Sequence, residues 1–262
     1  MQILQLDNVD LHFCEDGDPE GRPVVFANSL GTDLRLWDKI IPMLPDGLRL
    51  IRFDKRGHGL TSCPKPPFTM GALVSDIEAL CDHLDVKDAV IVGCSVGGLI
   101  AQGIAVKRTD QVRAMVLANT GAKIGTAEMW QDRIDAVAAG GIEAIAEAIL
   151  DRWFSKDFLQ SAELAAWRCM LTRTPGDGYM GVSAAISGTD FYTTTASLTL
   201  PTLAIAGSED GATPPDLVRE TAALVKGSRF ELIRGAGHLP MVEKPREFAD
   251  LLTGFLKEVG HV

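Results

Sequence analysis

Short apolar runs alternate along the chain with longer stretches in which apolar residues recur every three or four positions. Eight runs have the composition of β-strands: Ile3–Leu6, Val9–Phe13, Val24–Ala27, Arg49–Phe53, Ala89–Val92, Met115–Ala118, Leu203–Ala206 and Phe230–Ile233. Several of the later runs are apolar throughout, which is typical of parallel strands buried on both faces. Helical stripes, such as the one from Leu73 to Leu84, separate the runs. This alternation predicts an α/β fold with a mostly parallel eight-stranded sheet.

One segment departs from the alternation. Residues 122–197 contain helical patterns and no convincing strand, so we expect a helical cap inserted after the sixth strand. The core then consists of residues 1–121 and 198–262. The cap should cover the sheet edge where the carboxyl ends of the strands meet, which is where open α/β sheets bind ligands. Thr69 is expected to cap one core helix, and Thr213, which precedes Pro214, to cap another.

Composition and charge exclude several classes of function. The chain has 262 residues, of which 46% are hydrophobic, and a net charge of −10, which argues against binding nucleic acid through its phosphates. The five cysteines are scattered and form no C-x-x-C, so neither a disulfide framework nor a zinc site is expected. No signal peptide and no membrane-spanning run is found. These features predict a cytoplasmic protein without metal or cofactor; a homo-oligomer is compatible with them.

The most informative motif is the G-x-S-x-G sequence at 93–97, which lies between an apolar run and a helical pattern. In this strand–turn–helix setting the central residue, Ser95, sits on a tight turn and projects above the sheet as a nucleophile. The Val96 N–H, at the start of the helix, would face developing negative charge. The alternative is a serine in an ordinary glycine-rich turn.

A serine hydroxyl needs a base, and the base needs a carboxylate to orient it. His238 follows the eighth strand and Asp210 follows the seventh, with neighbouring Glu209 as a weaker choice. Both positions reach the same sheet edge as Ser95. The chain order serine, acid, histidine is that of α/β-hydrolases. His58, in the R-G-H-G loop, is interpreted as structural.

A second oxyanion donor is expected in the loop after the third strand. The Leu30 N–H is the candidate, paired with that of Val96. The side chain of Asn28 or Ser29 is expected to order this loop.

The chain resembles the 3-oxoadipate enol-lactonases, which have the α/β-hydrolase fold. The matching segments span most of the sequence: Asn28–Asp33, Trp37–Asp38, Phe53–Gly59, Gly93–Gln102, Leu117–Thr126, Ile205–Pro215 and Gly235–His238. The resemblance implies hydrolysis of a five-membered enol-lactone that carries a carboxymethyl arm. Ser95 would attack the ring carbonyl, and His238 would take the proton and later activate water.

Such a substrate is an anion, and the chain is acidic, so a local cation must hold the carboxylate. Arg133 lies on an otherwise apolar helical stripe that includes Trp130, and we expect both to contact the substrate, with Trp153 as a further wall. The alternative is that Arg133 lies at the edge of the stripe and extends to solvent.

Two other classes of function compete with this interpretation. The first is another α/β-hydrolase: a broad carboxylesterase, a perhydrolase-type haloperoxidase or a C–C bond hydrolase. The second is a receptor that keeps the hydrolase fold without catalysis. The complete set of Ser95, Asp210 and His238 argues against the receptor.

Overall fold

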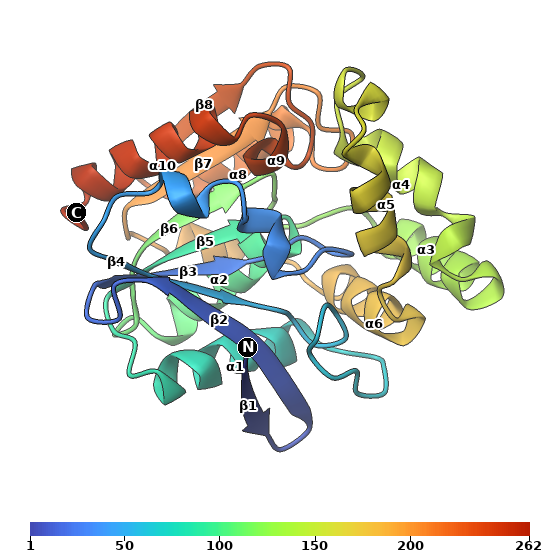
Figure 1. The fold of residues 1–262 in the computed structure, drawn as a ribbon, viewed down its shortest axis with the longest axis horizontal. Helices are drawn as coiled ribbons and strands as arrows, with labels where there is room; N and C mark the ends of the chain where they lie inside the picture. The colour runs from blue at the N-terminus through green and yellow to red at the C-terminus, as the bar shows by residue number, and fades with distance from the viewer.

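The computed structural model describes residues 1–262, and its centre is one eight-stranded sheet (Figure 1). The strands are β1 (Gln2–Leu6), β2 (Val9–Gly17), β3 (Arg22–Ala27), β4 (Leu48–Phe53), β5 (Ala89–Cys94), β6 (Val112–Ala118), β7 (Thr202–Gly207) and β8 (Arg229–Ile233). Their order across the sheet is β1-β2-β4-β3-β5-β6-β7-β8. β2 pairs antiparallel with β1 and β4, and all other neighbouring strands are parallel, so the predicted mostly parallel sheet is confirmed.

Burial explains why the apolar runs became strands. Every residue of β5 and β7 is buried, as expected of strands that are covered on both faces. The two strands end next to the turns that carry Ser95 and Asp210. Two fully buried strands therefore position the turns that carry Ser95 and Asp210.

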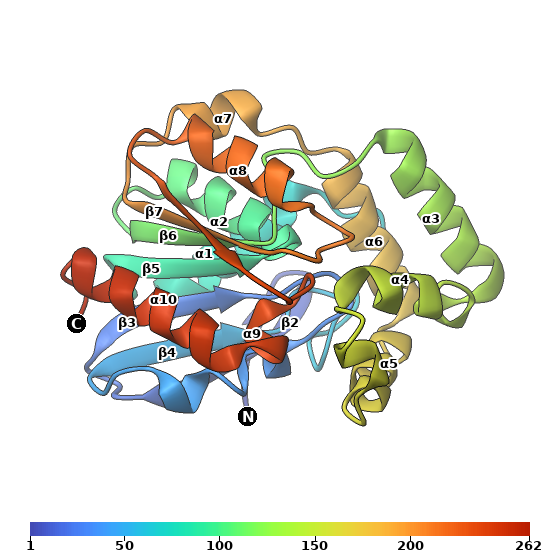
Figure 2. The same cartoon turned by 90° about the horizontal axis from the view of Figure 1, so that it is seen from above.

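Helices cover both faces of the sheet. They are α1 (Met70–His83), α2 (Val96–Lys107), α3 (Ala127–Gly140), α4 (Ala146–Trp153), α5 (Leu164–Thr172), α6 (Gly176–Ser187), α7 (Tyr192–Ala196), α8 (Pro215–Leu224), α9 (Pro240–Glu243) and α10 (Pro245–Glu258). Short 3₁₀ turns are η1 (Leu34–Trp37), η2 (Ile41–Met43), η3 (Ile142–Ala144) and η4 (Phe158–Gln160). Figure 2 shows α10 crossing one face of the sheet, while α1 and α2 pack together on the other face.

Helices α3–α6 follow β6 and gather at one end of the sheet (Figures 1 and 2). They cover the carboxyl ends of the parallel strands, where the sequence predicts a cap. The last helix of the segment 122–197 behaves differently, because α7 packs against α2 and α8. The exact domain limits at 122 and 197 stay a prediction. None of the helices has the length and apolar character needed to cross a membrane.

The two expected helix caps have different outcomes. Thr69 caps α1, because its side chain accepts a hydrogen bond from the Ala72 N–H at 3.1 Å. The prediction for Thr213 is wrong: α8 begins at Pro215, and no side chain caps it. The Thr213 hydroxyl instead donates to Asp210 at 2.7 Å. The Thr213 hydroxyl, which the sequence pattern predicted as a helix cap, thus forms its hydrogen bond with a buried carboxylate.

Candidate active site

Ser95 occupies a strained turn between β5 and α2. Its backbone angles are φ 59° and ψ −119°, a left-handed conformation that is rare for a residue with a side chain. Two glycines make the turn possible. A Cβ atom on Gly93 would lie 2.1 Å from the Gly97 carbonyl oxygen, and one on Gly97 would lie 2.0 Å from that of Ala27. The structure therefore has the tight strand–turn–helix geometry that the motif predicts.

His238 and Asp210 are hydrogen bonded after β8 and β7. Their Nδ1 and Oδ2 atoms are 2.9 Å apart, and both side chains are almost fully enclosed. Because Asp210 accepts, Nδ1 carries the proton and Nε2 is left free to act as a base. Ser95 and His238 line the same cavity. Glu209 is exposed and its carboxylate accepts from the Lys156 N–H, so it has no part in this pair.

Several neighbours keep Asp210 ionised. Burial opposes the charge, but His238 and hydrogen bonds from Asn119 and Thr213 outweigh it, so the pKa of Asp210 is lowered. The Asn119 amide donates to Oδ2 at 2.7 Å from a left-handed backbone position at the end of β6. Sequence reasoning missed Asn119; its place directly after a buried strand was the available signal.

Two backbone N–H groups are available beside Ser95. Neither the Leu30 N–H nor the Val96 N–H donates a hydrogen bond within the chain. Val96 opens α2, where the first N–H groups lack helical partners. Leu30 lies in a turn closed by the Thr32 N–H, which donates to the Ser29 carbonyl at 3.2 Å. This arrangement suits an oxyanion hole.

Residues of the segment after β4 form hydrogen bonds with the loop that carries Leu30. The buried Lys55 donates to the Thr32 carbonyl at 2.8 Å, and His58 Nε2 accepts from the Gly31 N–H at 3.0 Å. Burial lowers the pKa of His58 far below its usual value, so the ring is neutral. His58 is thus a structural residue, as the sequence indicates. Asn28 also orders the loop, because its amide donates to the Phe53 carbonyl at 2.7 Å.

A second serine lies at the same site. The Ser29 hydroxyl is 3.4 Å from His238 Nε2, while no hydrogen bond joins Ser95 Oγ to another group within the chain. Ser29 is almost completely buried, whereas Ser95 is 8% exposed. The sequence suggested Ser29 only as a loop-ordering residue. Substitution of each serine in turn decides which of the two hydroxyls reacts.

The cavity above Ser95 has a volume of about 250 Å³ and carries two arginines. Arg133 stacks on Trp130, with its guanidinium carbon 4.8 Å from the ring centroid. Arg152, which sequence reasoning missed, donates to the Gly211 carbonyl at 2.9 Å. Neither arginine has a carboxylate partner, and burial together with the charge of Arg133 lowers the pKa of Arg152. The cavity therefore presents positive charge that the chain does not neutralise.

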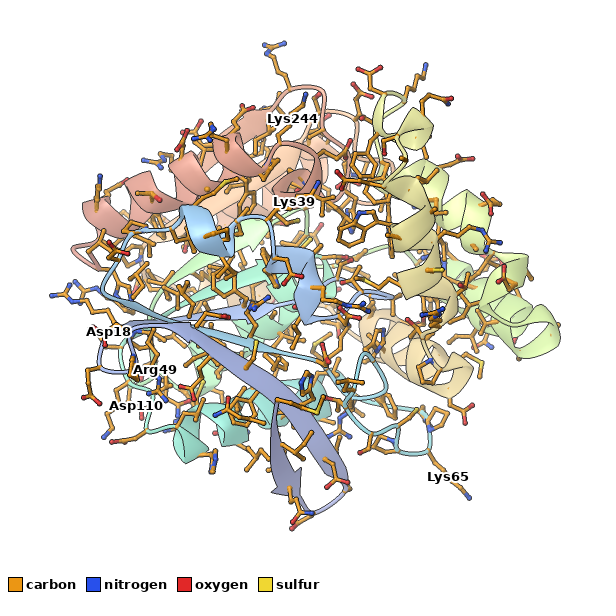
Figure 3. The ribbon with its side chains drawn as sticks, in the orientation of Figure 1. Asp18, Lys39, Arg49, Lys65, Asp110 and Lys244 are labelled. Atoms are coloured by element: carbon orange, nitrogen blue, oxygen red, sulfur yellow. The ribbon has the colours of Figure 1, made fainter.

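Apolar and aromatic side chains complete the cavity. Trp130, Trp153 and Tyr179 are buried and line it. Figure 3 shows that other cations lie elsewhere: Lys65 and Lys244 project away from the molecule, and Arg49 lies at the opposite end of the sheet from the cap. No group of three or more His, Cys, Asp or Glu side chains is arranged to hold a metal ion. Cys94 is buried, which raises its thiol pKa far above the usual value and disfavours a thiolate nucleophile.

Lys55 gives a prediction for stability. Burial lowers its pKa from 10.5 to about 7. Between these values unfolding takes up a proton, so the contribution of Lys55 to the free energy of unfolding is complete above pH 10.5 and is lost as the pH falls to about 7. Relative to Lys55→Met, the wild type should therefore gain about a few kcal/mol over this range. Urea unfolding at a series of pH values measures the difference.

The control for Lys55 is Lys65→Met, which alters an exposed lysine. Its unfolding free energy should follow that of the wild type at every pH. A wild-type advantage over Lys55→Met that does not change with pH would show that the amine is not neutral in the folded protein.

Comparison with known proteins agrees with this geometry. The model of the family described as "Alpha/beta hydrolase family" matches residues 24–251. The chain belongs to this family. It is 30% identical to 3-oxoadipate enol-lactonase 2 of Acinetobacter baylyi over 97% of this chain and 96% of that protein. It is 32% identical to 3-oxoadipate enol-lactonase 1 of the same organism over 92% and 91%.

A solved structure points the same way. The enol-lactonase from Burkholderia xenovorans superposes with a TM-score of 0.94 and 32% identity, covering 98% of this chain and 100% of that one. The resemblance to enol-lactonases that the motifs indicated is thereby confirmed. The chain is an α/β-hydrolase with enol-lactonase relatives.

Proposed function

We propose that this α/β-hydrolase opens 3-oxoadipate enol-lactone to 3-oxoadipate, a step of the β-ketoadipate pathway, in the cytoplasm. The observation that carries the proposal is the pair of arginines, Arg133 and Arg152, without carboxylate partners in the cavity above Ser95. Two half-buried arginines without carboxylate partners in one cavity of a chain with a net charge of −10 favour the binding of an anion there. Similarity to enol-lactonases supports a lactone with a carboxylate arm as that anion.

In the first half of the reaction Ser95 is the nucleophile. His238 Nε2 takes the hydroxyl proton as Oγ attacks the ring carbonyl, and the carbonyl oxygen becomes an oxyanion held by the Leu30 and Val96 N–H groups. The bond between the carbonyl carbon and the ring oxygen then breaks. The leaving group is an enolate, which takes the proton from His238 Nε2 and becomes a ketone, so the imidazole is neutral again. The acyl chain stays on Ser95.

In the second half water replaces the leaving group. His238 Nε2 removes a proton from water, the hydroxide attacks the ester carbonyl, and Ser95 leaves with the proton. Asp210 stays ionised throughout and stabilises the imidazolium. Its lowered pKa supports this role. The enolate needs little acid assistance, so stabilisation of the oxyanion should contribute most to the rate.

The arginines give the cavity its preference for an acid. A guanidinium can pair with the carboxylate arm through two parallel hydrogen bonds. Binding of the anion would also offset the repulsion between Arg133 and Arg152; burial first, and then the charge of Arg133, lowers the pKa of Arg152. Trp130 and Trp153 would enclose the ring, as expected from the sequence.

Arg133→Ala tests this charge selectivity. We expect kcat/KM for the enol-lactone to fall about 10–100-fold, because a charge-assisted contact is lost, and kcat/KM for a neutral ester of similar size to stay nearly unchanged. Steady-state kinetics on both substrates measures the two effects. The control is Arg168→Ala, which removes a half-exposed arginine of α5 that is paired with Glu143 and Glu147. Equal losses on both substrates would refute the ion-pair role.

Measuring substrate preference in the wild type tests the whole proposal. Loss of enol-lactone absorbance and release of phenol from short aryl esters give kcat/KM for each. The proposal requires the lactone to be preferred by two or more orders of magnitude. A preference for aryl esters would favour a broad carboxylesterase. No hydrolysis of either substrate would favour a perhydrolase, a C–C bond hydrolase or a receptor.

A further inference from the structure

A carboxylate that the reaction above does not use joins the loop of His238 to the cap. Glu243 is the last residue of α9 and is half-buried. Its Oε1 accepts from the Gly237 N–H at 2.7 Å, and its Oε2 accepts from the Ser155 N–H at 3.1 Å and the Ser155 hydroxyl at 2.5 Å. Gly237 directly precedes His238, and Ser155 lies just beyond the end of α4. One side chain therefore bridges the loop of the proposed base and the cap.

The backbone of Gly237 is held at both of its polar groups. Its N–H donates to Glu243, and its carbonyl accepts from the Asn119 amide at 3.3 Å. A Cβ atom at this position would lie 2.4 Å from the Trp153 carbonyl oxygen, so glycine allows the cap to pass this close. The position of the next residue, His238, therefore depends on the contacts of Gly237.

The same part of the cap contacts both loops that carry the pair of acid and base. The His238 N–H donates to the Trp153 carbonyl at 2.7 Å. In the loop after β7, the Gly211 N–H donates to the Arg152 carbonyl at 3.1 Å. Arg152 and Trp153 also line the cavity described above. Residues that line the cavity and the loop of the proposed base are thus attached to one short stretch of backbone.

Hydrogen bonds stabilise the charge of Glu243. Both of its oxygens accept, which is the pattern of an ionised carboxylate. Burial raises the pKa of Glu243, while the hydrogen bonds from Ser155 and Gly237 oppose this rise, and no cation pairs with the carboxylate. Hydrogen bonds to a charged group are stronger than those between neutral groups. Loss of the charge should therefore weaken the link between the cap and the loop of His238.

We propose that Glu243 is a positioning residue for the base: it fixes the backbone before His238 against the cap, so that the imidazole keeps its hydrogen bond with Asp210. The inference rests on the role proposed for His238 and does not depend on which ester or lactone is the substrate. When the bridge is weakened, the loop should open more often, and each opening separates the imidazole from Asp210. The rate of catalysis should then fall, while binding of substrate changes little.

Exchange of the His238 Nδ1 proton with water tests the proposal without any substrate. The proton is followed in NMR spectra, and His238→Gln assigns its signal by loss. In Glu243→Gln the exchange should be about tenfold faster, because an amide can accept on one side only. The His12 Nδ1 proton is an internal reference that should not change, since this nitrogen lies 2.8 Å from Asp54 in another part of the fold.

Steady-state kinetics with an aryl ester measures the consequence for catalysis. Glu243→Gln should lower kcat about tenfold and leave KM within about threefold. Ser155→Ala removes one of the three hydrogen bonds, so both the fall in kcat and the rise in proton exchange should be about threefold. The double variant should lose no more than Glu243→Gln, because both residues act through one bridge. Glu247→Gln, at an exposed carboxylate of α10, is the control and should match the wild type.

The outcomes separate this proposal from that for the lactone. A wild type that hydrolyses neither lactone nor aryl ester would refute the proposed function, and the exchange of the His238 proton would still decide the role of Glu243. Equal exchange in Glu243→Gln and the wild type would overturn the positioning role, as would an equal acceleration for the His12 proton, which would indicate loosening of the whole fold. Should Glu243→Gln fail to fold, Ser155→Ala decides: unchanged exchange of the His238 proton in that variant would refute the bridge.

Discussion

Ser95→Ala should lower kcat/KM for the enol-lactone by at least about 10⁴-fold. Without the hydroxyl no acyl-enzyme forms, and only binding and oxyanion stabilisation remain to assist direct attack by water. The substitution removes one atom from a residue whose hydroxyl makes no hydrogen bond within the chain, so the fold should persist. Initial rates of lactone loss measure the activity, and thermal unfolding checks the fold.

Ser29→Ala is the matched control, because Ser29 is the other hydroxyl near His238 Nε2. It should cost less than about tenfold in kcat/KM, because the Ser29 hydroxyl has one contact, with His238, and the strained turn of the G-x-S-x-G motif carries Ser95. If Ser29→Ala abolished activity and Ser95→Ala did not, the assignment of the nucleophile would be reversed.

Asp210→Asn should lower kcat by about 10³–10⁴-fold and leave KM within a few-fold. An amide presents a donor where His238 Nδ1–H needs an acceptor, so the ring is held in the wrong tautomer. It also removes the charge that stabilises the imidazolium. Thr213 and Asn119 both donate hydrogen bonds to Asp210 Oδ2. An amide nitrogen in the place of Oδ2 could not accept these hydrogen bonds. Steady-state kinetics at saturating lactone measures kcat.

Glu209→Gln provides the control for Asp210. It alters the adjacent, exposed carboxylate and should leave kcat nearly unchanged. A similar loss of kcat in both variants would mean that catalysis depends on the total negative charge of this loop. The specific pairing of His238 with Asp210 would then not explain the rate.

The sequence predicted those parts of the molecule that depend on local pattern. Apolar runs predicted the central strands most clearly, because burial on both faces, as in β5 and β7, leaves few other compositions. The spacing of Gly93 and Gly97 gave the Ser95 turn, since any side chain at these positions would collide with backbone. Chain order then singled out Asp210 and His238, and the structure brings these two together.

What the sequence missed depends on contacts between distant segments. Arg152 reaches the cavity only because α4 ends beside the loop that contains Gly211. Thr213 has the position of a helix cap, yet a buried carboxylate competes for its hydroxyl more strongly than exposed N–H groups do. The sequence also did not predict that Lys55 holds the loop that carries Leu30, because this depends on a hydrogen bond from Lys55 to Thr32, which is distant in the chain.

The most direct test of the central claim is to locate the covalent bond itself. The wild-type protein is treated with a serine-directed aryl phosphonate, digested with trypsin and analysed by mass spectrometry. Ser95 and Ser29 fall on different peptides, because several lysines and arginines separate them. The account predicts one phosphonyl group, on Ser95, and none in Asp210→Asn under the same brief exposure. Modification of Ser29, or no modification of the wild type, would contradict it.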